Sequence, residues 1–147
     1  MKIGLLTIHN TQNYGSLLQT YSTYKALHKL GLDIDLIDYR NDAITRREKP
    51  NDLVESISVK QIVKYFIWGN AQKRKYNSIM QFLKENTSMS PEYDKTSIVN
   101  ANKVYEGFIV GSDIVWGTNI TGRDMTYFLD FTSDDKKRYS FSSSIGT

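Results

Sequence analysis

The stretch GLLTIHNTQNYGSLLQ, residues 4–19, begins as an apolar run and ends as the start of a helical pattern. The run Lys2–Ile8 is almost continuously apolar, which is typical of a short strand buried on both faces. From Leu17 onward, apolar residues recur at spacings of three and four, as on one face of a helix. Ser16 and Gln19 have the spacing of a capping box at the start of that helix. A strand followed directly by a helix predicts the first half of a βαβ unit.

The second half of this unit follows at once. Gly31 lies where a left-handed residue ends a helix, and DIDLIDYR, residues 33–40, is typical of the next strand. GFIVGSD, residues 107–113, is the clearest later strand. Because strands alternate with helices, we predict one α/β domain over residues 1–147, with a Rossmann-like, mainly parallel open sheet.

The remaining segments are less regular. Between Val59 and Asn86 we expect two helices that part near Gly69, and we expect a short helix over residues 97–102. Further strands are expected at residues 127–131 and 138–146, and loops at residues 41–52 and 88–93.

Composition limits the classes of function. The chain is 39% apolar and 24% charged, as ordinary soluble domains are. It has no cysteine, which excludes disulfides, thiolate nucleophiles and cysteine metal sites, and favours a cytoplasmic protein. The net charge of +3 is spread over scattered basic clusters without a nucleic-acid-binding module, so we expect no nucleic acid partner. A peripheral position at the inner face of the membrane is the alternative location.

Polar side chains gather where two of the predicted strands end. The loop His9–Gly15 carries more hydrogen-bonding groups than a turn needs, and Gly111–Asp113 forms a second polar corner. Ligands of open α/β sheets bind beyond the carboxyl ends of the strands, so the two loops face one crevice if their strands are neighbours. In the alternative interpretation, Asn13 and Ser16 only cap the helix and Gly15 only relieves the turn.

Other candidates also allow two interpretations. Asp113 could act as a base or accept a hydrogen bond from a sugar, or it could order its own loop. Trp116 could stack on a sugar ring, although a place in the core is favoured. The chain lacks the G-x-G-x-x-G fingerprint and a P-loop lysine, so neither NAD nor ATP is supported. With only His9 and His28 present, we expect no metal site.

Five segments follow one another in a recognisable order: HNTQNYGSLLQTYSTYKALHKLG, IDLIDYR, FIVGSDIVW, YFLDF and KKRYSFSSSIG. This ordered set resembles the N-terminal half of the polysaccharide pyruvyl transferase family. The resemblance implies one Rossmann-like half of a GT-B-type enzyme with its active site between two domains, and hence a missing C-terminal domain. The family's asparagine-tyrosine-glycine falls on Asn13, Tyr14 and Gly15, its glycine-serine-aspartate on Gly111, Ser112 and Asp113, and its tryptophan on Trp116.

The resemblance implies transfer of a pyruvyl group from phosphoenolpyruvate onto two hydroxyls of a glycan or lipid-linked saccharide, with no further cofactor. His9 and Asp113 are the proton-transfer pair that we expect in this half. Neither corner contains an arginine, so we expect the anion-binding arginines from the C-terminal half, and self-association through an exposed domain interface. The substrate-binding residues that we expect are Asn10, Asn13, Tyr14, Gly15, Gly111, Ser112 and Trp116.

Two other functions stay open from the sequence. One is a GT-B-type glycosyltransferase, which a requirement for a sugar nucleotide would identify. The other is a non-catalytic glycan-binding or scaffold domain, which would bind glycan without turnover.

Overall fold

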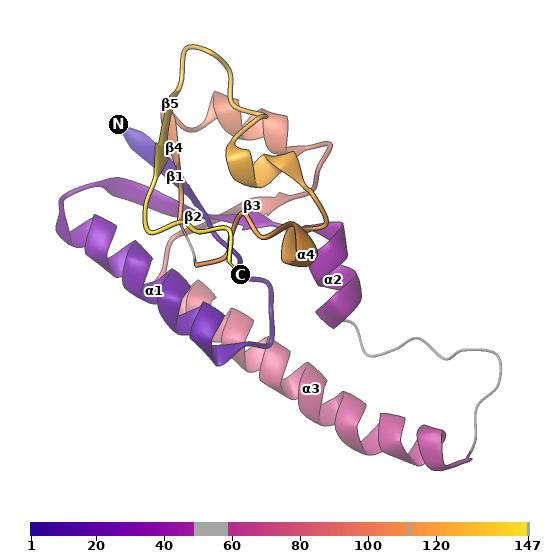
Figure 1. Ribbon diagram of the computed structural model, residues 1–147. Helices are drawn as coiled ribbons and strands as arrows, with labels where there is room; N and C mark the ends of the chain where they lie inside the picture. Colours follow the sequence, from indigo (N-terminus) through magenta and orange to yellow (C-terminus); the bar gives the residue numbers. More distant parts are fainter. Residues whose placement is uncertain (49–58, 112, 147) are drawn as a thin grey trace.

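The computed structural model describes residues 1–48, 59–111 and 113–146, and these contain a five-stranded sheet in the order β3-β2-β1-β4-β5 (Figure 1). All four pairings between neighbouring strands are parallel. The Rossmann-like α/β class is therefore confirmed, with the three clearest predicted strands side by side. The strands are β1 (Lys2–Leu6), β2 (Asp33–Tyr39), β3 (Met89–Tyr93), β4 (Gly107–Val110) and β5 (Lys137–Ser140).

Helices cover both faces of this sheet. Figure 1 shows α1 and α3 along one face, while the 3₁₀ helices η1 and η2 lie against the other. Among the described residues, the helices are α1 (Tyr14–Lys29), α2 (Asp42–Glu48), α3 (Val59–Asn86), α4 (Thr118–Thr121), η1 (Ile98–Lys103) and η2 (Met125–Phe128).

Two apolar layers hold the helices to the sheet. Alternation along β1 sends Ile3 and Leu5 toward α1 and α3, while Leu6 packs in the opposite layer with η1 and η2. Gly4 also lies in the crowded interior, where an added Cβ would come within 2.8 Å of Ile37 Cδ1. Since both faces are buried, the strand ends are fixed in place, and the loops that follow them are held at one edge.

The start and end of α1 test two predictions. Gly31 adopts a φ of +81°, so the expected left-handed C-cap is confirmed. The capping box is wrong, because α1 begins two residues before Ser16. The N-cap is Asn13, whose side chain accepts from the Gly15 N–H, and the Ser16 hydroxyl instead donates to the Ile8 carbonyl.

Several other expected elements differ in the structure. The segment 88–93 contains β3 rather than only a loop; Pro91 hides this strand in the sequence, but an edge strand tolerates proline. Residues 59–86 form one helix, α3, because a glycine costs a helix only about 1 kcal/mol. The charged segment 41–52 contains α2, and its residues 49–52 lie outside the described residues.

The apolar run 127–131 is not a strand. Its first residues belong to η2, which Asp124 caps by accepting from the Thr126 N–H, and Leu129 then turns into the left-handed region at a φ of 61°. A short apolar run cannot distinguish a strand from a buried turn by periodicity alone. The last expected strand is present as β5, but it ends at Ser140 rather than continuing to residue 146.

Candidate functional site

The two predicted polar corners leave the same edge of the sheet. Leu6 of β1 pairs with Val110 of β4, and the Gly111 N–H donates to the Leu6 carbonyl at 3.0 Å. The chain runs from β1 to β2 on one side, whereas β4 lies on the other side of β1, so this is the topological switch point of the sheet. Crevices at such points are the usual ligand sites of doubly wound folds. The expected adjacency of the two strands is confirmed.

The corner after β4 carries an exposed carboxylate. Asp113 accepts a hydrogen bond from the Ser144 hydroxyl at 2.7 Å, and Ser144 Oγ accepts in turn from the Ile114 N–H at 2.9 Å. Ile114 has a φ of 52°, an unfavourable conformation for a β-branched residue. The serine-rich segment after β5 thus fixes this corner, a support that the sequence analysis did not anticipate. Ser112 lies outside the described residues.

Gly111 and Trp116 serve the packing of this corner. An added Cβ on Gly111 would lie 3.0 Å from the Phe141 carbonyl oxygen, a tight contact, so the close approach of the two segments favours glycine. Trp116 is half-buried against the core, donates its indole N–H to the Tyr127 carbonyl at 2.9 Å, and stacks on Phe128. These contacts favour the core interpretation of Trp116.

The residues at the start of α1 are exposed. Asn13 Oδ1 accepts from the Gly15 N–H at 2.8 Å, which is the geometry of a helix cap. Tyr14 is 58% exposed, and its ring lies 4.4 Å from the Lys75 ammonium. Capping is therefore one role of Asn13, and a contact with substrate stays a prediction.

His9 and Asn10 are enclosed beneath their loop. His9 is only 1% exposed, with its Nε2 3.1 Å from Asp38 Oδ1 and its Nδ1 3.4 Å from the Thr7 carbonyl oxygen. Both ring nitrogens therefore lie within hydrogen-bond distance of an oxygen atom. Burial acts to raise the pKa of Asp38, but the hydrogen bond with His9 and the positive charges of His9 and Arg40 outweigh it and hold that pKa below its ordinary value.

An arginine that the sequence analysis did not assign completes this network. Arg40 follows β2 and donates from Nη1 to Asn10 Oδ1 at 2.6 Å, and from Nη2 to Asp38 Oδ2 at 2.9 Å. Neither corner loop contains an arginine of its own, but Arg40 reaches the loop after β1 from the end of β2. One signal was present in the sequence: Asp38 and Arg40 lie two apart in the predicted strand 33–40, and residues with this spacing point to the same face.

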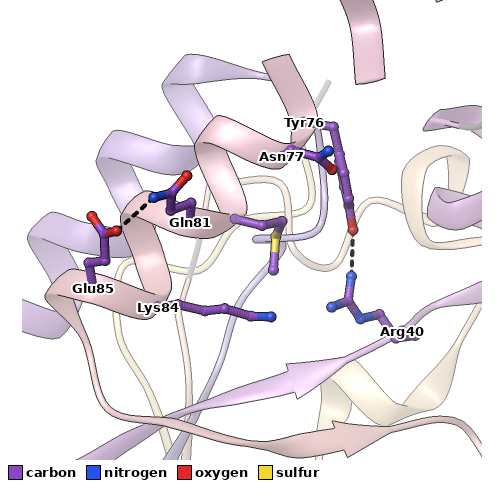
Figure 2. Close-up of a pocket in the computed structure, with 7 residues that line it drawn as sticks. Arg40, Tyr76, Asn77, Gln81, Lys84 and Glu85 are labelled. Carbon is purple, nitrogen blue, oxygen red and sulfur yellow. Dashed lines mark hydrogen bonds between the residues drawn. The ribbon is translucent and has the colours of Figure 1, made fainter. Parts of the chain in front are cut away.

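A pocket of about 400 Å³ lies beside this network, between Arg40 and α3 (Figure 2). Arg40 donates to the Tyr76 hydroxyl at 2.6 Å, and that hydroxyl donates in turn to Asn10. Two lining residues of the pocket, Arg40 and Tyr76, therefore contact Asn10 in the loop after β1. None of the expected site residues lines the pocket itself. Its lining residues are Arg40, Tyr76, Asn77, Met80, Gln81, Lys84 and Glu85.

Comparison with protein-family models matches residues 13–147 to polysaccharide pyruvyl transferase. The chain belongs to the polysaccharide pyruvyl transferase family. The matched region contains the cap of α1, Arg40 and the Asp113 corner, while His9 and Asn10 precede it. No match was found among the curated proteins or the solved structures.

Two further properties of this pyruvyl transferase family member concern metal-binding groups and membrane-spanning helices. Within residues 1–48, 59–111 and 113–146, the structure shows no group of three or more histidines and acidic residues that could hold a metal ion. Over the same part of the chain, none of the helices combines the length and apolar character needed to cross a membrane.

Proposed function

We propose that the protein transfers a pyruvyl group from phosphoenolpyruvate to two hydroxyls of a glycan or lipid-linked saccharide. The observation that carries this proposal is the family match over residues 13–147, which includes the exposed Asp113 at the switch point of the sheet. A doubly wound sheet binds its ligands at this position. We place the protein in the cytoplasm, at the inner face of the membrane where the acceptor is lipid-linked.

The reaction forms a ketal and needs two proton transfers. Each acceptor oxygen forms a bond to the central carbon of the pyruvyl group, and the bond from that carbon to the phosphate oxygen breaks. One hydroxyl proton is balanced by the proton that the methylene carbon gains as it becomes a methyl group. The other leaves with phosphate. General acid and base groups typically accelerate such steps by about 10²–10⁴-fold.

In this proposal, Asp113 is the base for an attacking hydroxyl, because its carboxylate is exposed at the crevice. His9 holds the proton for the methylene carbon, with Asp38 fixing the orientation of its ring. Since the side chain of His9 is fully enclosed, this role requires the His9–Gly15 loop to move when the donor binds. Arg40 is already paired with Asp38, so the cations for phosphate and carboxylate come mainly from a second domain.

The test incubates the full-length protein with phosphoenolpyruvate and with glycan isolated from the cells in which the protein naturally occurs. We expect glycan-dependent release of phosphate and the appearance of ketal-linked pyruvate on the sugar. A requirement for a sugar nucleotide would instead identify a glycosyltransferase, and binding of glycan without turnover would contradict the transferase proposal. Residues 1–147 alone are expected to release no phosphate, because they supply only part of the site.

A further inference from the structure

The pocket between Arg40 and α3 contains a cation that its neighbours do not neutralise. Arg40 is paired with Asp38 and Glu92, whose oxygens lie 2.9 and 3.2 Å from its Nε. Glu85 accepts a hydrogen bond from Gln81 at 2.8 Å. Within the described parts of the chain, Lys84 makes no ion pair or hydrogen bond, and Figure 2 shows its ammonium directed toward the side of Arg40.

The rest of the lining suits a sugar. The Tyr76 hydroxyl and the side-chain amides of Asn77 and Gln81 offer donors and acceptors to hydroxyl groups, while Met80 offers an apolar surface to a ring face. The volume of about 400 Å³ falls within the roughly 300–1,000 Å³ that is usual for small-ligand pockets. A lysine without a partner adds a preference for a negative charge on the ligand.

We propose that this pocket binds an acidic sugar unit of the acceptor, one that carries a carboxylate or a phosphate. Lys84 contacts the acidic group, and Asn77 contacts a hydroxyl. Arg40 joins the pocket to Asn10 of the loop after β1, so the next unit of the glycan lies near the switch point. The inference rests on the proposed function in one respect, namely that the acceptor is a saccharide.

The experiment measures binding to the full-length protein without phosphoenolpyruvate, so it does not depend on turnover. The probes are glucuronic acid, glucose 6-phosphate, glucose and inorganic phosphate. Calorimetry or NMR measures the dissociation constant of each probe. We expect at least one acidic sugar to bind about 10-fold more tightly than glucose and than inorganic phosphate. The carboxylate and phosphate probes distinguish the two sources of charge.

Matched variants test the residues of the pocket. Lys84→Met keeps the aliphatic length and removes the charge, so the affinity for the acidic sugar is expected to fall about 10-fold, and that for glucose less than 2-fold. Asn77→Ala should weaken binding of both sugars. Lys95→Met, an equal charge change at an exposed position away from the pocket, should leave every affinity unchanged.

Two results would overturn the inference. One is equal affinity for acidic and neutral sugars, and the other is an equal effect of Lys84→Met and Lys95→Met. If the acidic sugar binds through Lys84 but no pyruvyl transfer occurs in the separate assay, the proposed reaction fails and the binding site stands. If transfer occurs with unchanged binding in Lys84→Met, the reaction stands and the pocket assignment fails.

Discussion

The two corners at the carboxyl edge of the sheet differ in how they hold their carboxylates. Asp38, in β2, is 5% exposed and lies within ion-pair distance of both His9 and Arg40. Asp113, beyond β4, is exposed and accepts a hydrogen bond from a serine hydroxyl. The same edge of the fold thus carries an enclosed corner, around Asp38, and an open corner, around Asp113.

This difference separates two roles that a polar residue can have near an active site. In the enclosed corner, hydrogen bonds link the side chains of His9, Asn10, Asp38 and Arg40, so the network mainly fixes the loop after β1 and the position of Arg40 beside the pocket. In the open corner, an exposed carboxylate lies beyond the end of β4, at the edge of the sheet where ligands of this fold class usually bind. Loss of stability should therefore dominate the effect of changes at Asp38, and loss of turnover the effect of changes at Asp113.

The largest effect is expected from Asp38→Ala. It removes the shared partner of His9 and Arg40, and breaking one side of a buried ion pair typically costs about 3–5 kcal/mol. Chemical denaturation should show the free energy of unfolding reduced by about that amount. Asp33→Ala, an exposed aspartate on the same strand, is the matched control and should change it by less than about 1 kcal/mol. Equal effects of the two substitutions would show that the enclosed corner contributes little to stability.

Asp113→Asn tests the open corner. The amide oxygen can still accept from Ser144, so the free energy of unfolding should change by less than about 0.5 kcal/mol. The substitution removes the basic group, so turnover of the full-length protein should fall by about 10²-fold or more. Steady-state kinetics with phosphoenolpyruvate and glycan measure this. Unchanged turnover would return Asp113 to a structural role in its loop.

The enclosed corner should also make the protein sensitive to acid. The pKa of Asp38 lies below its ordinary value of 3.8 in the folded protein, so the unfolded chain binds protons at higher pH. The contribution of Asp38 is therefore complete above about pH 4–5 and is lost as the pH falls through the folded pKa, at up to about 1.4 kcal/mol per pH unit. Asp38→Asn should show a shallower loss of stability in this range, measured by denaturation at each pH. If the wild-type protein and Asp38→Asn lose stability equally as the pH falls, Asp38 does not cause the sensitivity to acid.

The sequence predicted the centre of the sheet because that part depends on local pattern. The runs Lys2–Ile8, 33–40 and 107–113 are apolar enough to be recognised as buried strands. β3 was missed because its residues alternate only partly and include Pro91, and its strand conformation depends on pairing with β2. Elements at the edge of a sheet take their structure from a neighbour rather than from their own pattern.

The candidate site divides in the same way. Both polar corners were predicted, since each is a cluster of polar residues directly after an apolar strand. The enclosed network was not, because Arg40, Asn10 and Tyr76 lie far apart in the sequence and meet only after folding. Which polar group becomes buried depends on contacts that no local spacing encodes.

The smallest effect is expected at Asn13, the exposed N-cap residue of α1. Its side-chain oxygen caps α1, so Asn13→Ala should cost about 1 kcal/mol, whereas Asn13→Ser keeps a capping oxygen and should cost a few tenths. Serine lacks the amide donors, so both variants lose any hydrogen bond that the Asn13 amide gives to substrate. Loss of one such bond should reduce turnover of the full-length protein by about 10-fold in both variants, measured beside their unfolding free energies. If turnover instead follows stability, falling in Asn13→Ala and remaining intact in Asn13→Ser, Asn13 acts on the site only by starting the helix.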